Sequence, residues 1–325
     1  MIFFITFLRA LAACLITNAH YTGIYPTDMI ANGGLIGDVL FFAVSGYCLY
    51  NVKYELSPKG FGSWYGKRIW RVYPPALIMT VIFMILGSYS LSDHKAFWWY
   101  VYPTYYHFVA SIIVLYIPFF FIMKIKKLQS NIPILMAVIA IAWIIVYITI
   151  YDKSHYHIDT VREPMIRFLF MESMLLGAWF RQNDKKLRNQ FKVIYPVLSF
   201  VAFIAYFASK LLFSRKESLS SFQFINLIMI FVLLYLLFRT FCGIDGKLEN
   251  MPKPIKSVVE FISKLTLEIY VVQYVLIDVI RSRHLPFPVN WIFITVSIIV
   301  SAFILHTVCD LMYKSVDKLI KKEVK

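Results

Sequence analysis

Long apolar stretches alternate with short polar segments along the whole of this 325-residue chain. Ten stretches approach the length of about 20 residues that a helix needs to cross a lipid bilayer. They cover residues 2–20, 35–52, 74–91, 105–123, 132–150, 165–180, 191–213, 222–241, 258–280 and 289–312. The sixth is the weakest, because Arg167 and Glu172 interrupt it. The pattern predicts an all-α fold, a polytopic membrane bundle of about ten transmembrane helices.

The composition also indicates a membrane protein. Hydrophobic residues make up 60% of the chain and charged residues only 16%, whereas about 25% of the residues in a typical soluble domain are charged. The net charge of +15 would suit a nucleic-acid-binding protein, but the lysines and arginines lie in short clusters between the apolar stretches. Such clusters set membrane topology and attract anionic lipids. We therefore expect membrane lipids, and no nucleic acid, among the partners.

The basic clusters also predict the orientation of the chain. If the N-terminus is cytoplasmic, the inner segments carry 23 lysines and arginines and the outer segments carry nine. Because positive charge accumulates on the cytoplasmic side, both termini are predicted to be cytoplasmic. An even number of spans agrees with this, since it places both termini on the same side. We expect a multi-pass cell-membrane protein with one membrane domain, residues 1–313, a basic cytoplasmic tail, residues 314–325, and no cleaved leader.

Two polar side chains lie in the first apolar stretch. Arg9 and His20 are eleven residues apart, which is about three turns of α-helix, so they share nearly one helical face. The rise between them is about 16 Å, over half the hydrocarbon thickness of a bilayer. Ionisable groups are costly inside a membrane helix and by default indicate a functional site. In the predicted orientation, Arg9 lies toward the cytoplasm and His20 toward the outer end.

Asp38 lies near the start of the second stretch, at a predicted depth similar to that of His20. A carboxylate beside an imidazole fixes its tautomer and raises its basicity, as a general base requires. We interpret His20, Arg9 and Asp38 as the candidate catalytic residues. The alternative for Asp38 is a charge at the N-terminus of the second helix, where the helix dipole favours an acidic residue.

Residues 41–47, FFAVSGY, place Ser45 and Gly46 in an otherwise bulky helix. Small residues let membrane helices pack closely, which is the favoured interpretation. The alternative is a hydroxyl that lines a narrow channel. Because no G-x-S-x-G elbow is present, Ser45 is not predicted to be a hydrolase nucleophile.

A basic and aromatic segment, residues 64–75, precedes the third predicted span and ends in two prolines that are expected to break or bend its start. Arg68 and Arg71 are three residues apart, so they would share a helical face, with Lys67 beside them. One interpretation is a positive-inside anchor. The other is a site for a phosphorylated donor, because the arginine guanidinium binds phosphate bidentately.

Other polar positions carry less information. Glu172 could pair with a neighbouring arginine or with a substrate hydroxyl. His155 and His157 lie near Asp152 and Asp159. Two histidines two residues apart are a poor metal signature, so this group is predicted to be a solvated outer loop.

The four cysteines all lie in apolar stretches, and their spacing matches no metal site. Cys309 and His306, on the last predicted helix, are expected to be packing residues. We expect no metal cofactor.

The motifs near the N-terminus together resemble the acyltransferase-3 family of integral membrane acyltransferases, whose members share a core of ten helices. The first helix of the family carries an arginine, ten intervening residues and a histidine, as Arg9 and His20 do. Its second helix carries an F-F-x-x-S-G-aromatic motif, commonly with an acidic residue just upstream. In this chain the motif is matched by Phe41, Phe42, Ser45, Gly46 and Tyr47, and the acid by Asp38. A basic R-x-x-R motif that runs into an aromatic residue and a proline is matched by Arg68, Arg71, Tyr73 and Pro74.

The resemblance implies transfer of an acyl group, expected to be acetyl, from acyl-CoA on the cytoplasmic side to a hydroxyl of a cell-surface glycan of the capsule, exopolysaccharide or O-antigen type. Acetyl-CoA would be the donor and a polysaccharide or lipid-linked oligosaccharide the acceptor, at a bacterial inner membrane. A homodimer or a polysaccharide-assembly complex would be compatible with this role. His20 would be the general base or a transient acyl carrier. The donor would contact Lys67, Arg68, Arg71 and Ser45, and the substrate would contact Tyr47 and Glu172.

Two features depart from the family pattern. Many members carry a histidine in the penultimate helix where this chain has Gln273, so a second catalytic histidine is not expected, and Glu268 and Gln273 are candidates to line the site. We also expect no appended extracytoplasmic hydrolase-like domain. A transporter or flippase for a lipid-linked or small sugar is the alternative function, although internal repeats and interrupted helix pairs are not evident. A non-catalytic scaffold in polysaccharide assembly is a third.

Overall fold

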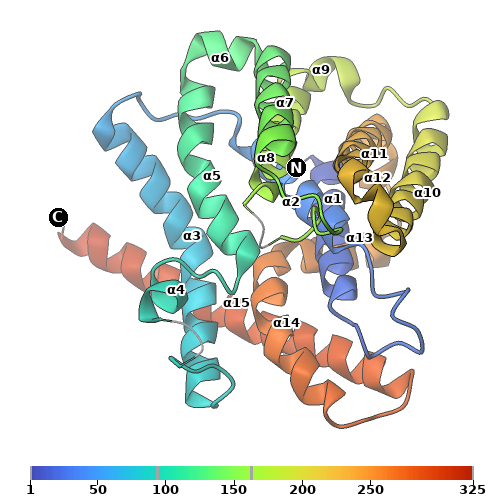
Figure 1. Ribbon diagram of the computed structural model, residues 1–325. Helices are drawn as coiled ribbons and strands as arrows, with labels where there is room; N and C mark the ends of the chain where they lie inside the picture. The colour runs from blue at the N-terminus through green and yellow to red at the C-terminus, as the bar shows by residue number, and fades with distance from the viewer. Residues whose placement is uncertain (1, 93–94, 162–163, 324–325) are drawn as a thin grey trace. The chain divides into compact units, whose positions relative to one another are not determined.

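The computed structural model describes residues 2–92, 95–161 and 164–323, with side chains to residue 316. All regular secondary structure in this part of the chain is helical (Figure 1). The long helices are α1 (Phe3–Ala19), α2 (Gly34–Leu49), α3 (Pro58–Ile85), α5 (His107–Lys124), α7 (Ile132–Thr149), α8 (Ile166–Gln182), α10 (Ile194–Arg215), α11 (Phe224–Gly243), α13 (Lys253–Lys264), α14 (Thr266–Arg281) and α15 (Val289–Glu323). The short helices are α4 (Ala96–Tyr100), α6 (Lys126–Ser130), α9 (Asp184–Leu187), η1 (Glu217–Phe222) and α12 (Asp245–Glu249).

The predicted all-α polytopic bundle is confirmed. Within the described residues, six helices are long and apolar enough to cross a membrane, namely α3, α5, α7, α10, α11 and α15, and α1 and α2 are shorter apolar helices. Each of the ten predicted stretches overlaps one long helix or more. The orientation and the 1–313 domain boundary stay predictions, and Met1, Arg162 and Lys325, which entered them, lie outside the described residues.

Three boundaries differ from the prediction. α3 begins at Pro58, so the prediction that the third helix starts at the prolines is wrong, and both prolines lie inside it. The ninth stretch is two helices, because α13 ends at Lys264 and α14 starts at Thr266. α13 is an amphipathic helix with exposed Ile255 and Val258, a pattern typical of a helix at a membrane surface. The last helix continues through the predicted tail to Glu323.

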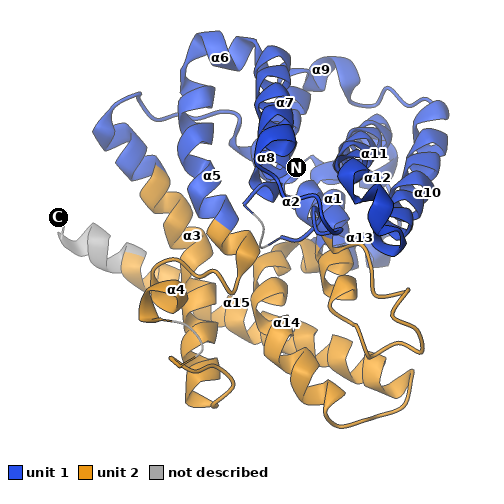
Figure 2. Cartoon of the chain, viewed as in Figure 1, with its two compact units in different colours: residues 1–12, 35–64, 111–260 blue, residues 13–34, 65–110, 261–325 orange. Residues whose placement is uncertain are grey.

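The chain forms two compact units (Figure 2). Unit 1 contains residues 1–12, 35–64 and 111–260, and unit 2 contains residues 13–34, 65–110 and 261–325. In unit 1, α7 packs on α8 and α10 packs on α11 (Figure 1). In unit 2, α14 and α15 form an antiparallel pair. Tyr274 of α14 packs against the ring of Tyr106.

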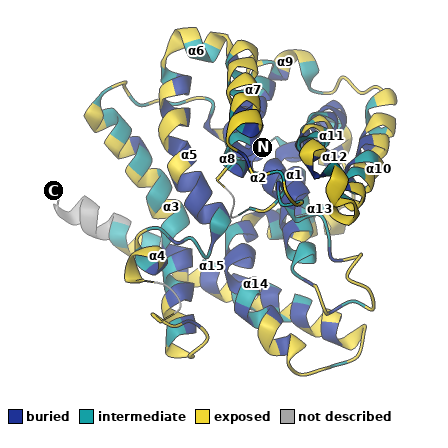
Figure 3. Cartoon of the chain, viewed as in Figure 1, coloured by how far each residue is buried: buried dark blue, intermediate teal, exposed yellow. Residues whose placement is uncertain are grey.

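Many large apolar side chains are exposed on the long helices. α7 and α10 carry rows of exposed isoleucine, valine, leucine and phenylalanine (Figure 3). The share of buried residues in their most apolar windows is only 17% for α7 and 22% for α10. A water-soluble protein rarely exposes apolar patches of this extent, whereas lipid tails solvate them without cost.

Candidate functional site

Close packing of α2 against α8 fixes the F-F-x-x-S-G-aromatic segment in unit 1. A Cβ atom on Gly46 would lie 1.9 Å from the Met174 carbonyl oxygen, and one on Gly177 would lie 1.8 Å from the Ala43 carbonyl oxygen. The two backbones therefore touch at two glycines, as in small-residue crossings of membrane helices. This contact agrees with the packing interpretation for Gly46, and the neighbouring Ser45 is half-buried.

Arg9 lies in the middle of α1 and is half-buried. Its Nη2 atom lies 3.7 Å from Sγ of Cys48, the residue that follows the aromatic position of the α2 motif. Within unit 1 the structure thus brings together Arg9 and the C-terminal end of the α2 motif, which sequence spacing alone did not connect.

The hydroxyl of Tyr47 belongs to an ionic network in unit 1. It donates to Oδ1 of Asp184 at 2.7 Å and accepts from Nη1 of Arg181 at 3.3 Å. Arg188 joins Asp184, at 3.3 Å, to Asp245, at 3.6 Å. These contacts hold the hydroxyl of Tyr47 inside the protein, so the geometry gives Tyr47 an anchoring role besides its predicted substrate contact.

Asp245 also fixes the start of α1. Its Oδ1 atom accepts the backbone N–H of Phe4 at 2.7 Å. The first N–H groups of a helix have no partner within it, and a carboxylate both satisfies one and interacts favourably with the helix dipole. The sequence analysis missed this role, because 241 residues separate the partners.

Asp38 and Glu172 lie within two long helices of unit 1, α2 and α8. Asp38 is the fifth residue of α2 and is buried. Because dipole stabilisation fades beyond the first turn, the N-terminal alternative does not account for its position. Glu172 lies within α8, and its Oε1 atom is buried without a hydrogen-bond partner among the described residues. Leaving a buried carboxylate oxygen without a partner costs free energy, which is compatible with the predicted substrate contact of Glu172.

His20 is the first residue after α1, and it belongs to unit 2. Its backbone N–H donates to the Thr17 carbonyl at 3.1 Å, and its ring meets that of Tyr274 edge-on, with centroids 4.8 Å apart. The loop beyond it is fastened by Asn18, whose Nδ2 donates to the carbonyls of Ile30, at 2.8 Å, and Asn32, at 2.9 Å. His20 therefore lies where a helix end, a fixed loop and an aromatic wall from α14 meet. Its predicted pairing with Asp38, which belongs to unit 1, stays a prediction.

A cavity of about 290 Å³ lies beside this loop in unit 2. Its lining residues are Gly23, Ile24, Ile280, Arg281, His284, Leu285 and Asn290. Arg281 lies within electrostatic range of His20 and is paired with Asp278 at 3.2 Å. The amide of Asn290 donates to the Ile24 carbonyl at 2.8 Å, which joins the start of α15 to the loop. No sequence pattern predicts this cavity, since its walls come from distant segments.

The basic residues of α3 lie inside the helix and not before it. Arg68 is half-buried, and Lys67 and Arg71 are exposed. Because Pro75 has no N–H, the Arg71 carbonyl lacks its helical donor. The hydroxyl of Tyr313 on α15 donates to that carbonyl at 3.4 Å. A side chain from another helix thus compensates the proline, and α3 continues.

A carboxylate–imidazole–carboxylate group connects α14 and α15 in unit 2. Nδ1 of His306 lies 2.8 Å from Oε1 of the buried Glu268, and Nε2 lies 3.7 Å from Oδ2 of Asp310. The interpretation of His306 as a packing residue is wrong, because its ring bonds a buried carboxylate. Arg71, Asp310 and Glu268 all act electrostatically on Tyr313, so this group adjoins the basic face of α3. The i, i+4 spacing of His306 and Asp310 was the available signal.

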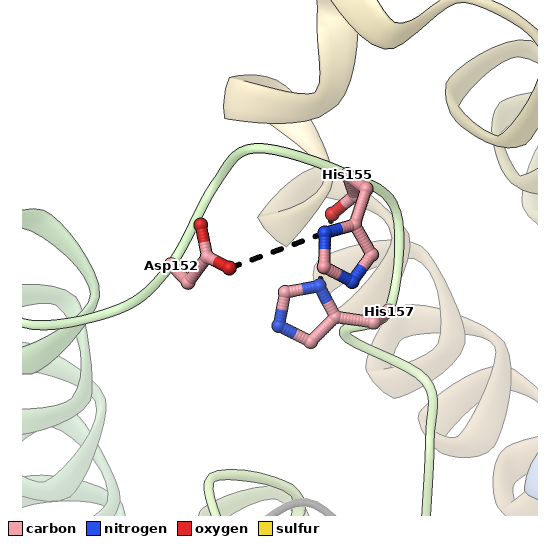
Figure 4. Close-up of side chains that lie close together, drawn as sticks. All are labelled: Asp152, His155 and His157. Atoms are coloured by element: carbon pink, nitrogen blue, oxygen red, sulfur yellow. Dashed lines mark hydrogen bonds and ion pairs between the residues drawn. The ribbon is translucent and has the colours of Figure 1, made fainter.

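The loop between α7 and α8 contains a further polar cluster in unit 1. One ligand atom each from Asp152, His155 and His157 lies within 4.8 Å of the others (Figure 4). Asp152 and His155 are exposed, as the solvated-loop interpretation requires, but the three side chains converge.

Residues 2–308 match the family described as an acyltransferase domain. Comparisons with curated proteins and with solved structures give no significant match. The matched region includes residues of both units and every candidate site residue described above except Tyr313 and Asp310. The chain therefore belongs to the acyltransferase-3 family of membrane acyltransferases.

Proposed function

We propose that the chain transfers an acyl group, expected to be acetyl, from acyl-CoA at the cytoplasmic face to a hydroxyl of a cell-surface glycan. The observation that carries the proposal is the arginine and histidine of one apolar segment, eleven residues apart, in a chain of this family. Both ends of that segment are held in place, by Asp245 at the start of α1 and by Asn18 beside His20. Fixed positions are what a catalytic pair needs.

His20 is proposed as the general base. Its imidazole takes the proton of the acceptor hydroxyl while the hydroxyl oxygen forms a bond to the thioester carbonyl carbon. The carbon–sulfur bond then breaks, and the coenzyme A thiolate takes up a proton. In the second form of this mechanism, the imidazole accepts the acyl group first and passes it to the hydroxyl. Asp38 is proposed to orient the imidazole.

The unit 2 cavity is the proposed acceptor subsite. Its polar groups, Arg281 and His284, suit sugar hydroxyls or an acidic sugar substituent, and Arg281 lies near His20. A volume of about 290 Å³ is at the small end of ligand pockets, which fits one sugar unit of a longer glycan. Arg281→Ala should then raise the acceptor KM and leave the donor KM unchanged.

The donor phosphates are proposed to bind the basic face of α3. Arg68 and Arg71 are one turn apart on a helix that continues through its prolines, so both guanidinium groups are presented from a rigid element. Ser45 is a further proposed donor contact.

The test uses proteoliposomes containing the full chain, acetyl-labelled acetyl-CoA and candidate glycans. We expect alkali-labile label on the glycan, and a rate at least about 100-fold lower in His20→Gln, which keeps the size of the side chain but removes the base. Full transfer by a correctly folded His20→Gln protein would overturn the catalytic assignment. Movement of unmodified glycan across the bilayer, without label transfer, would support the transporter alternative.

The donor site has a matched control on another helix. Arg68→Ala combined with Arg71→Ala should raise the donor KM with little change in acceptor KM. Lys126→Ala combined with Lys127→Ala removes two charges from α6 and should leave the donor KM unchanged. Equal effects of the two double variants would favour the simple anchor interpretation.

A further inference from the structure

The cluster of Asp152, His155 and His157 has the chemistry of a transition-metal site (Figure 4). Two imidazole nitrogens and one carboxylate oxygen are the three-ligand set that Zn²⁺ takes in open sites, with a fourth position left for water. The question is whether the protein organises these groups or whether they are only neighbours in a loop.

Asp152 is oriented as an ionised ligand. The backbone N–H of Ser154 donates to Oδ1 of Asp152 at 2.9 Å, and the Ser154 hydroxyl donates to Oδ2 at 3.1 Å. A neighbouring carboxylate, that of Asp159, is paired with Lys210 at 2.6 Å.

His157 is fixed in the tautomer that a metal ligand needs. Its Nδ1 atom lies 2.9 Å from the carbonyl oxygen of His155, which can only accept, so Nδ1 carries the proton and the Nε2 lone pair is left for a metal. Metal-binding histidines characteristically donate their second ring nitrogen to such a carbonyl. The rings of Tyr151 and His155 each stack on the ring of His157, with centroid distances of 4.9 Å and 4.4 Å.

A buried glutamine shapes the backbone of the cluster. Oε1 of Gln223, at the start of α11, accepts the N–H groups of His157 and Ile158, both at 2.9 Å. Nε2 of the same side chain donates to the His155 carbonyl at 3.0 Å. That carbonyl is the group that sets the His157 tautomer. The side chain of Gln223 is completely buried, so the organisation of the two histidines originates in the protein interior.

We propose that Asp152, His155 and His157 bind one divalent transition-metal ion, with Zn²⁺ as the best match to their donor set. Metal–ligand bonds of about 2.0–2.2 Å require ligand atoms closer together than 4.8 Å, and the exposed side chains of Asp152 and His155 can rotate inward by about 1 Å. The bound ion would fasten the loop between α7 and α8. This proposal does not rest on the acyltransfer mechanism.

The experiment uses the full chain in detergent after removal of metal with a chelator. Titration with Zn²⁺ should show one ion per chain, and Co²⁺ should give the visible absorption of a tetrahedral site. His157→Ala and His155→Ala should each weaken Zn²⁺ binding at least tenfold. His284→Ala, which removes a histidine from a different loop, should not.

Thermal unfolding provides a second measurement that does not depend on activity. Saturating Zn²⁺ should raise the unfolding temperature of the parent chain and of His284→Ala, but not that of His155→Ala, because an ion that binds only the folded state stabilises it. His155 is exposed, so its removal should leave the metal-free chain folded. Stoichiometric binding that survives in a double His155→Ala and His157→Ala chain, or no binding by the parent at 100-fold molar excess of Zn²⁺, would overturn the proposal.

Discussion

Replacing Gly46 by alanine should separate α2 from α8. The new Cβ atom would lie 1.9 Å from the Met174 carbonyl oxygen, whereas real contacts of this kind are at least about 3.0 Å. The obstacle is backbone, which cannot rotate out of the way, so the two helices must move apart by about 1 Å. Overpacking of this kind costs about 1–3 kcal/mol. Alanine regains about 1 kcal/mol in helix propensity, and because the clash is severe we expect a net loss of about 2 kcal/mol.

For a chain of 325 residues, the unfolding entropy of about 2.1 cal/mol/K per residue converts this loss into a decrease in Tm of about 3 °C. Gly177→Ala should have a similar effect, because its Cβ would lie 1.8 Å from the Ala43 carbonyl oxygen. Once one alanine has separated the helices, the second meets less resistance. The double variant should therefore lose less stability than the two single variants together.

Gly66→Ala is the matched control. Gly66 lies within α3, and a Cβ atom there would meet nothing within 4 Å. This variant should gain stability, by up to about 1 kcal/mol, from helix propensity alone. Thermal unfolding in detergent, followed by circular dichroism, gives the unfolding temperatures of the parent chain and of the four variants. If Gly46→Ala unfolds at the same temperature as Gly66→Ala, the close crossing of α2 and α8 is refuted.

Three further predictions concern single side chains. Tyr313→Phe should destabilise the chain by about 1 kcal/mol in thermal unfolding, because it removes the donor to the Arg71 carbonyl, and an unchanged Tm would contradict that role. Glu172→Gln should leave stability unchanged or raise it, because it removes a buried orphan carboxylate. The same variant should lower label transfer to the glycan, and full activity would make Glu172 merely structural. Glu268→Ala should destabilise the chain by about 1–3 kcal/mol in thermal unfolding, because it removes the hydrogen-bond partner of the His306 ring, and it should cost less in combination with His306→Ala; additive costs would argue against their pairing.

The sequence predicted most of the fold, because apolar length alone identifies membrane helices. It failed where a local rule was overridden by a distant contact. Pro74 and Pro75 indicate a helix start when read locally, yet α3 continues through them, and the carbonyl freed by Pro75 finds a donor in Tyr313, which is 242 residues from Arg71 in the sequence. Hydropathy likewise merged α13 with α14, because it does not distinguish an amphipathic surface helix from the first turn of a span.

The candidate site shows the same limit. Sequence spacing made Arg9, His20 and the glycine of the α2 motif candidates, since these signals are local in the sequence. It gave no indication that Asn18 fastens the His20 loop or that His306 bonds Glu268, because each needs the neighbouring loop or helix in place. The prediction of a solvated loop at His155 and His157 rested on their sequence spacing alone. The feature that organises them is Gln223, whose contribution comes from 65 to 68 residues away.

Contacts inside unit 1 support the predicted alternation of the spans across the membrane. If consecutive spans alternate in direction, the start of α1 and the ends of α2, α8 and α11 must lie on one side. Phe4 bonds Asp245, just after α11, and Tyr47, near the end of α2, bonds Asp184, just after α8. One ionic network thus joins four segments that alternation assigns to the same side. Because this network contains Arg181 and Arg188, and lysines flank it, the positive-inside rule predicts that this side is cytoplasmic.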